Sequence, residues 1–350
     1  MSNIKFTHLA VQSDYSLLEG YGTIEEYVKL AKEKGQDSIA LTDHNSLLGV
    51  YKFIDECHKN NIKPIVGVTM NLAPKHEGGA KHLDYVEYSN TIPVVWKGSV
   101  TRLRLYAKNK EGLLNLFKLV EESYKPENFF NYPRIDLDIL KKYSNNLMCL
   151  SGDRFSETSC RIRASQYNEA LKEAAILKEI FGDDFYIELI PIIDEPDETM
   201  LSSSILKSSM KIAKKIGVKT IVTNDVYYPN RGDEEIQEKI LALGNKNKIS
   251  ETPVDKGGLR FRYTAGERYL KSGQEIVEYM NNTIIKKLKA TGDKSSVLEL
   301  SKAIQRTQEI ADKVQNVTLE YDNQLRPHVE IPEEFKNSYE YMKFLIDEGF

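Results

Sequence analysis

The sequence predicts an α/β fold in which a parallel sheet closes into a distorted barrel, followed by a small C-terminal α+β extension. Short apolar runs alternate with amphipathic stretches along most of the chain, which is typical of parallel α/β folds. The apolar runs lack strict alternation, as expected for strands buried on both faces. No glycine-rich phosphate loop follows the first run, and an open dinucleotide-binding sheet would carry one there. A barrel is therefore the better prediction.

The expected elements follow one another as strand and helix. The predicted strands are 4–11, 38–42, 65–70, 103–107, 147–150, 185–190 and 220–223. The predicted helices between them are 23–34, 47–59, 113–123, 168–181, 198–216 and 234–243. The first helix has the clearest ends, because Thr23 and Glu26 form a capping box and Gly35 follows the last turn.

Two regions depart from this rhythm. Residues 73–100 form a long segment without a helix pattern, and a loop of that length usually packs on itself or has a function. After Gly244 we expect short irregular strands and then two helices, at 259–263, 269–271, 293–314 and 339–348. At roughly 100–200 residues per domain, two domains or one barrel with an appendage are expected. We place the boundary near residue 285, which leaves 286–350 as a helical linker.

Composition excludes several classes of protein. Hydrophobic residues make up 41% and charged residues 29% of the chain, an ordinary globular balance. No apolar run approaches the roughly 20 residues that span a bilayer, and the N-terminus lacks a signal-peptide pattern. The three cysteines show no metal or disulfide spacing, so we expect a cytoplasmic protein without membrane association. A net charge of −4 disfavours a wholly electrostatic nucleic-acid clamp.

Residues that carry chemistry follow several of the predicted strands. They are Glu19, Asp43, His44, Asp153 and Asp225. In a barrel the loops after the strands converge on one mouth, so this set indicates a metal site or the remnant of one. Taken singly, each residue is explained as well by a helix cap or a turn.

Other candidate motifs are weaker. His8 lies within the first predicted strand and is better explained as a packed core histidine. The Asp136–Asp138 pair invites a polymerase interpretation, but it opens a predicted helix, where acidic residues suit the positive end of the dipole. No Walker loop, HExxH motif or nucleophile elbow is present.

The strings around these residues resemble one family. They are FTHLAVQSDYSLLEG, IALTDHNSLLGVYKF, IKPIVGV, LSGD, FYIELI and VTNDVYY. Together they resemble the PHP (polymerase and histidinol phosphatase) domain at the N-terminus of bacterial DNA polymerase III alpha subunits, and the likeness covers almost the whole chain. The resemblance implies a distorted (β/α)7 barrel.

The resemblance also implies which metal ligands have been lost. Active PHP domains hold up to three metal ions with nine side chains. Here His44 and Asp225 match the family pattern outright, and Glu19 and Asp153 are still able to ligate. Five ligand positions are substituted, and they hold Ala10, Gln12, Thr69, Arg102 and Tyr227. On this pattern we expect no metal at the site, or at most one held by the four remaining residues.

Arg102 gives the loss a physical consequence. A guanidinium is charged at all accessible pH values and repels a dication. We hypothesise that Arg102 takes the place of the metal charge among Glu19, Asp153 and Asp225. Because TRLRLY alternates, the alternative is that Arg102 points outward and Arg104 occupies this position.

The resemblance implies the N-terminal part of a replicative DNA polymerase III alpha subunit, with this chain ending about where the catalytic palm domain would begin. The PHP domain would then be an inactive scaffold for the polymerase body in cis and for a separate proofreading exonuclease subunit. Magnesium and DNA would be bound by the full-length polymerase.

Two enzymatic alternatives remain. One is a metal-dependent phosphoesterase or 3′–5′ exonuclease that uses zinc or manganese at a reduced site. The other is a free-standing enzyme similar to histidinol phosphatase, which the missing HxH motif disfavours. The lysines at 286, 287 and 289 give weak support to direct DNA binding, because such runs are usually a solvated helix face.

Overall fold

The computed structural model describes residues 4–73, 100–129, 132–193, 198–258, 260–318 and 330–349. Apart from its two ends, the long loop predicted at 73–100 lies outside these residues. The chain divides into a large compact unit, Met1–Val317, and a small one, Thr318–Phe350.

One mixed sheet forms the centre of the large unit. Its strands are β1 (Ser38–Leu41), β2 (Lys63–Leu72), β3 (Thr101–Ala107), β4 (Leu147–Leu150), β5 (Phe185–Leu189) and β6 (Lys219–Val222), paired in that order. β1 pairs with β2, β4 with β5, and β5 with β6, each pair in parallel. β3 is antiparallel to both of its neighbours. The expectation of a wholly parallel sheet is therefore wrong at β3, because an apolar run carries no information on strand direction.

The segment 8–12 curls this sheet into a distorted barrel. His8 bridges Ile39 in β1, and Val11 bridges Val226, just beyond β6. The backbone N–H of Ala40 donates to His8 O at 2.8 Å, and that of Val226 donates to Ala10 O at 2.8 Å. The first predicted strand thus makes isolated bridges rather than a regular ladder, but it lies where the seventh strand is expected. The predicted distorted α/β barrel is confirmed.

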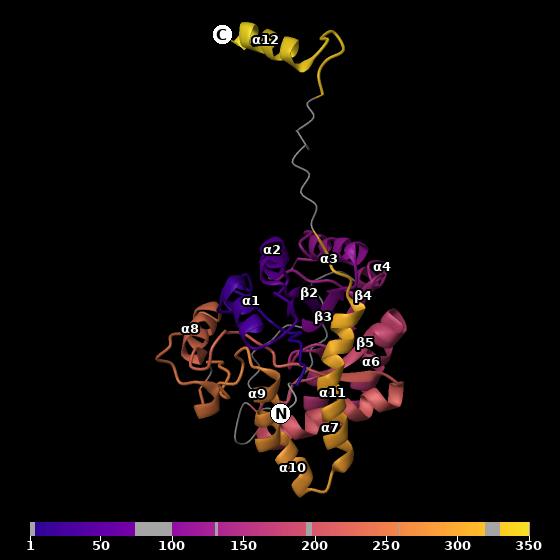
Figure 1. Cartoon of the computed structure of the whole chain (residues 1–350), viewed down its shortest axis with the longest axis vertical. Coiled ribbons are helices and arrows are strands. Elements are labelled where there is room, and N and C mark those ends of the chain that lie inside the picture. The colour runs from indigo at the N-terminus through magenta and orange to yellow at the C-terminus, as the bar shows by residue number, and fades with distance from the viewer. Residues whose placement is uncertain are drawn as a thin grey trace. The chain divides into compact units, whose positions relative to one another are not determined.

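Helices surround the strands (Figure 1). They are α1 (Ile24–Glu33), α2 (Val50–Asn60), α3 (Lys110–Ser123), α4 (Leu137–Lys142), α5 (Glu157–Arg163), α6 (Tyr167–Phe181), α7 (Glu198–Ile216), α8 (Glu234–Gly244), α9 (Gly273–Asn282), α10 (Ile284–Ala290) and α11 (Lys294–Lys313). The capping box of Thr23 and Glu26 is present at α1. Asp136 caps α4 and accepts from the backbone of Ile139, as its place before a helix predicts. The short strands expected at 259–263 and 269–271 are wrong for the described residues, where Arg260 and Tyr269 make only isolated bridges.

α11 closes the end of the barrel where the parallel strands begin. Its Ile310 and Ala311, with Val314, belong to the core cluster that also holds residues of all six strands. Lys63, at the start of β2, donates to Ala311 O at 2.6 Å, and Lys219, at the start of β6, pairs with Glu309 at 2.6 Å. The boundary expected near residue 285 falls inside the compact unit, because the barrel needs α11 to cover this core. The assignment of 1–285 to a PHP domain and of 286–350 to a linker stays a prediction.

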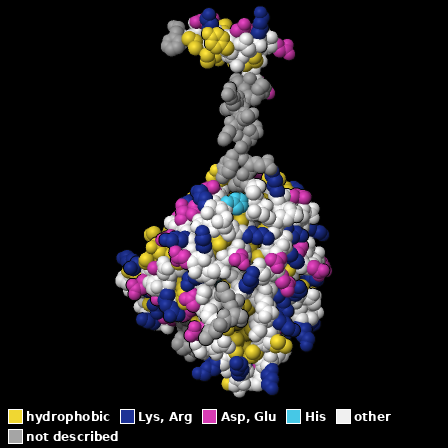
Figure 2. All heavy atoms as spheres, viewed as in Figure 1, with side chains coloured by type: hydrophobic (Ala, Val, Ile, Leu, Met, Phe, Trp, Pro, Cys, Tyr) yellow, Lys and Arg dark blue, Asp and Glu magenta, His cyan; other side chains and the backbone are white. Residues whose placement is uncertain are grey.

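The small unit contains α12 (Ser338–Gly349). Phe335 packs against Tyr341 and Phe344, with ring centroids 5.0 and 5.1 Å apart. Apolar side chains gather on this helix, whereas basic and acidic side chains are interspersed over the face of the large unit seen in Figure 2. None of the described helices is both long enough and apolar enough to cross a bilayer.

Candidate functional site

The predicted site residues meet at the mouth of the barrel. The parallel strands end there, and because β3 runs in the opposite direction, its first residues also lie there. Residues two apart in a strand share a face. Arg102, Arg104 and Tyr106 therefore all face the barrel interior, and the Tyr106 hydroxyl donates to Leu9 O at 2.6 Å. The sequence left open whether Arg102 or Arg104 points into the barrel. Both do, at different depths.

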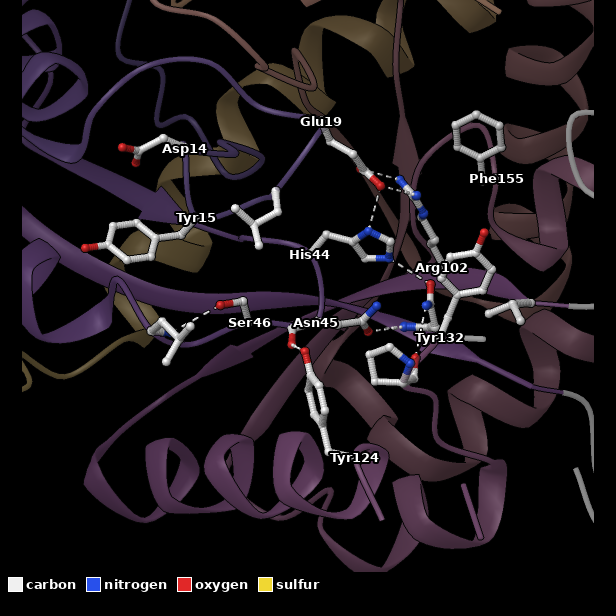
Figure 3. A pocket seen from close by; sticks show the side chains of 15 residues that line it. Asp14, Tyr15, Glu19, His44, Asn45, Ser46, Arg102, Tyr124, Tyr132 and Phe155 are labelled. Atoms are coloured by element: carbon white, nitrogen blue, oxygen red, sulfur yellow. Dashed lines mark hydrogen bonds and ion pairs between the residues drawn. The ribbon is translucent and has the colours of Figure 1, made fainter. Parts of the chain in front are cut away.

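Glu19 and Arg102 form the outer layer of the site (Figure 3). The guanidinium donates two hydrogen bonds to the carboxylate, Nη1 to Oε2 at 3.0 Å and Nη2 to Oε1 at 2.7 Å. Both side chains are largely buried. Burial alone would raise the pKa of Glu19, but Arg102 and His44 outweigh it and hold this pKa well below its usual value. Glu19 is therefore a fixed anion that is already neutralised.

Both ring nitrogens of His44 form hydrogen bonds within the site. Its Nδ1 contacts Glu19 Oε1 at 2.8 Å, and its Nε2 contacts Asn71 Oδ1 at 2.8 Å. The Asn71 amide nitrogen donates to Pro133 O at 3.0 Å, which leaves Oδ1 as the acceptor for His44. Both ring nitrogens of His44 thus face side-chain oxygens. A metal would have to displace one of these contacts to reach a ring nitrogen of His44.

Arg104 forms the centre of a deeper layer. Its guanidinium contacts Glu188 and Asp225, and it lies 3.8 Å from Asp153. Arg268 contacts the other oxygen of Asp225 at 2.8 Å. All five side chains are almost completely buried. Burial raises the pKa of Glu188 to about 7, although Arg104 opposes the shift, and burial likewise raises the pKa of Asp225.

Each carboxyl group in the two layers faces a basic side chain. Four carboxyl groups, those of Glu19, Asp153, Glu188 and Asp225, face the guanidinium groups of Arg102, Arg104 and Arg268 and the imidazole ring of His44. We call this set the mouth network. Buried carboxylates need such partners, because an unpaired buried charge is very costly. Among these described residues, a dication would have to compete with the guanidinium groups for the carboxyl groups.

Asp153 reaches the network through the SGD turn after β4. Gly152 has a positive φ of 98°, and a Cβ on it would collide with Arg102 O. Glycine is therefore required where the turn packs against β3. Asp153 Oδ1 accepts from the backbone of Phe155 at 2.7 Å, and its Oδ2 lies 3.9 Å from Arg102.

Asp43 lies outside the network and supports the loop that carries Glu19. It accepts from the backbone N–H of Ser13 at 2.7 Å, from the Ser13 hydroxyl at 2.9 Å and from the Ser16 hydroxyl at 2.7 Å. Asp43 is thus a positioning residue for the loop 13–20. Burial raises its pKa to about 6, and the bonds from Ser16 and Ser13 only partly offset this.

This raised pKa predicts a pH-dependent contribution to stability. The folded state binds the Asp43 proton more tightly than the unfolded chain does. The contribution is therefore present below about pH 4 and is lost as the pH rises through about 6. Urea titrations of the native chain and of Asp43→Asn should show their difference in unfolding free energy falling by about 3 kcal/mol between these limits. The unfolding free energy of the exposed control Asp37→Asn should depend on pH as that of the native chain does. If Asp43→Asn shows this same pH dependence, the role assigned to Asp43 is contradicted.

The substituted ligand positions have structural partners of other kinds. Ala10 uses its carbonyl to close the barrel, Thr69 donates to Thr42 O at 2.9 Å, and the hydroxyls of Tyr227 and Tyr263 lie 3.3 Å apart. Gln12 is buried, and its side-chain amide has no hydrogen-bond partner among the described residues.

Sequence reasoning did not identify three members of the site. They are Asn71, Glu188 and Arg268. Glu188 had a usable signal, because it is the only charged residue within the apolar run FYIELI. Asn71 differs from its apolar neighbours but lies just past the predicted strand 65–70, and Arg268 is not set apart from its charged and polar neighbours. His8 is buried as expected, and it contacts Lys271 O at 2.7 Å.

Comparison with known proteins identifies the family. The family model described as PHP domain matches residues 8–191, just over half of the chain. The chain belongs to the PHP domain family. A curated relative, DNA polymerase III subunit alpha of Borreliella burgdorferi, is 33% identical over 99% of this chain and 27% of its own length. The Campylobacter jejuni protein of the same name is 30% identical over 96% of this chain and 25% of its own. This PHP chain therefore spans about a quarter of these relatives.

Solved structures resemble the chain only distantly. A two-domain Bacteroides vulgatus protein, described as containing a PHP-like metal-dependent phosphoesterase, aligns over 67% of this chain and 55% of its own, with 10% identity and a TM-score of 0.36. The fold assignment rests on the family match and on the curled sheet described above.

The metal ions implied by the PHP family do not fit these residues. Both nitrogens of His44 are in contact with side-chain oxygens, and Glu19 and Asp225 each accept from guanidinium groups at both carboxylate oxygens. Within the described ranges, three or more histidine, cysteine or acidic side chains do not converge on one point. Binding a metal here would require these ion pairs to break.

Proposed function

We propose that this chain is the PHP domain of a bacterial replicative DNA polymerase III alpha subunit, and that its mouth network stabilises the barrel and does not catalyse hydrolysis. The curated relatives that align with nearly the whole chain carry that name. The main observation in support is that Glu19, His44 and Asp225 already have protein partners. They are three of the residues best placed to bind metal. Polymerase activity, with its magnesium and DNA, would belong to the longer protein, acting in the cytoplasm.

The network is well suited to a scaffold. It joins side chains from the loop before α1, the turns after β1 and β4, and strands β3 and β5, together with Asp225 after β6 and Arg268. Fixing these segments gives the barrel a rigid mouth without any ligand. The proposed partners are the polymerase body in cis and a separate proofreading exonuclease subunit. Co-elution of the purified chain with that subunit, unchanged by a chelator, tests the second partner.

A second candidate is a metal-dependent phosphoesterase or 3′–5′ exonuclease. The observation in its favour is that His44, Asp225, Asp153 and Glu19 do lie at one mouth, as a reduced zinc or manganese site requires. For this candidate the guanidinium groups of Arg102 and Arg104 would have to leave these carboxylates.

Hydrolysis separates the two candidates. Purified chain is incubated with bis(p-nitrophenyl) phosphate, and separately with a labelled single-stranded oligonucleotide, in manganese or zinc. We expect rates equal to those of the His44→Ala variant and of the metal alone, because the acidic and histidine side chains of the mouth network are already paired. Turnover by the native chain that disappears in His44→Ala would establish the enzyme and contradict the scaffold.

A further inference from the structure

The barrel mouth is surrounded by apolar side chains that nothing in the large unit covers among the described residues. Leu17 and Leu48 are 81% and 80% exposed, more than the other large apolar side chains that the structure describes. Tyr124 and Tyr132 at the same rim are 54% and 49% exposed. Grouped apolar exposure of this kind marks interaction sites in soluble proteins, and tyrosine is enriched at binding hot spots.

Two adjoining pockets lie beneath this rim. The larger has a volume of about 440 Å³ and is the one seen in Figure 3, and the smaller has about 160 Å³. Leu17, Glu19, Arg102, Tyr132 and Phe155 line both pockets, so the two are continuous. Leu17 stands where they meet. Such a pair of hollows suits two side chains presented by one ligand.

The basic side chains on the floor of the larger pocket already have an acidic partner. His44 and Arg102 line it, and both donate their hydrogen bonds to Glu19. Asp14 is the other charged residue in the lining. A phosphate group would meet a guanidinium that already pairs with Glu19, and it would also face Asp14. This chemistry favours an apolar occupant of the larger pocket over a nucleotide.

The loop that presents Leu17 is held rigidly. Leu18 has a positive φ of 63°, an uncommon conformation for a leucine. Asp43 binds the start of the same loop through Ser13 and Ser16. Strained backbone that is fixed by its surroundings is concentrated at functional sites. The bonds from Asp43 fix the loop in which Leu17 is exposed between the two pockets.

The smaller pocket has a basic edge. Gly244 and Asn245 line it, and the exposed lysines at 246 and 248 follow directly. Neither lysine forms an ion pair with an acidic residue in the described part of the chain. Arg154 lies over the rings of Phe261 and Tyr263, both of which line this pocket. Positive charge at one end gives a bound segment a preferred direction, with its acidic part at α8.

We propose that the barrel mouth is a docking site for a peptide segment of a separate protein. The segment carries two apolar anchor side chains, one for each pocket, and an acidic residue next to the anchor in the smaller pocket. The inference rests on the proposed function, because a mouth that hydrolyses phosphodiesters must stay open to its substrate. The hydrolysis assay and the binding experiment below fail independently, so the two claims are separable.

Selection from a phage-displayed library of random dodecapeptides on the full chain tests this proposal. We expect enriched peptides to share two apolar residues followed by aspartate or glutamate. Fluorescence anisotropy should show these peptides bound roughly tenfold more weakly by Leu17→Ser and by Leu48→Ser, as expected for loss of a hot-spot side chain. The control Leu298→Ser changes a leucine that is 57% exposed on α11 and should bind as the native chain does.

Three results would overturn the docking site. One is failure of the library to yield a consensus, and another is a consensus with basic residues in place of the acidic one. The third is binding of an oligothymidylate that Leu17→Ser abolishes, which would make the mouth a nucleic-acid site. Circular dichroism of each variant shows whether a loss of binding reflects loss of fold.

Discussion

Replacing Arg104 with alanine should lower the free energy of unfolding by about 3–5 kcal/mol. The guanidinium is completely buried and contacts Glu188 and Asp225, with Asp153 3.8 Å away. Its removal leaves these carboxyl groups without their central cation. The residual pairing of Asp225 with Arg268 limits the loss but does not serve Glu188. Urea denaturation followed by circular dichroism measures the difference.

Matched variants isolate the effect of burial. Arg231 also pairs with a glutamate, at 3.4 Å, but its side chain is 71% exposed, so Arg231→Ala should cost less than about 1 kcal/mol. Arg104→Met combined with Glu188→Gln removes a cation and an anion together and should recover part of the loss, because fewer unpaired charges remain. An Arg104→Ala cost no larger than that of Arg231→Ala would show that the mouth network does not stabilise the barrel.

The fragment 1–285 should fail to unfold cooperatively, whereas 1–317 should unfold as the whole large unit does. The shorter fragment lacks α11, whose Ile310 and Ala311, with Val314, complete the core at the closed end of the barrel. Uncovering these side chains forfeits on the order of 5 kcal/mol of hydrophobic stabilisation. That loss is comparable with the roughly 5–15 kcal/mol that stabilises a typical domain.

Calorimetry and dye binding distinguish the two fragments. We expect 1–285 to bind a hydrophobic dye and to show no sharp thermal transition, since the barrel interior is open to solvent. The 1–317 fragment should exclude the dye. A cooperative transition of 1–285 within a few degrees of that of 1–317 would mean that α11 is dispensable, and would favour the boundary near residue 285.

The regular elements were predictable where local signals define them. Thr23, Glu26 and Gly35 mark both ends of α1, and short apolar runs locate the strands. The direction of β3 was not predictable, because all seven of its residues are buried and no pattern distinguishes its two ends. The role of α11 was hidden for a different reason. It is rich in charged residues, and its buried stripe is narrow enough to suggest a solvated helix.

The part of the site that is carried by loops was predictable from the sequence. Glu19, His44 and Asp225 follow segments that end at the mouth, so strand order alone brings them together. Arg104 was considered only as a competitor for Arg102, although the alternation that raised the question places both inside the barrel. Glu188 pairs with a residue 84 positions away, and such a contact exists only once the sheet has curled.

The account depends on arginine and histidine side chains, rather than metal ions, holding the acidic residues of the mouth. Anomalous diffraction from crystals grown with manganese, and separately with zinc, tests this most directly. We predict no anomalous peak within bonding distance of His44 or Asp225, and guanidinium density for Arg102 on Glu19 in both crystals. A well-occupied ion coordinated by His44, with Arg102 displaced from Glu19, would contradict it.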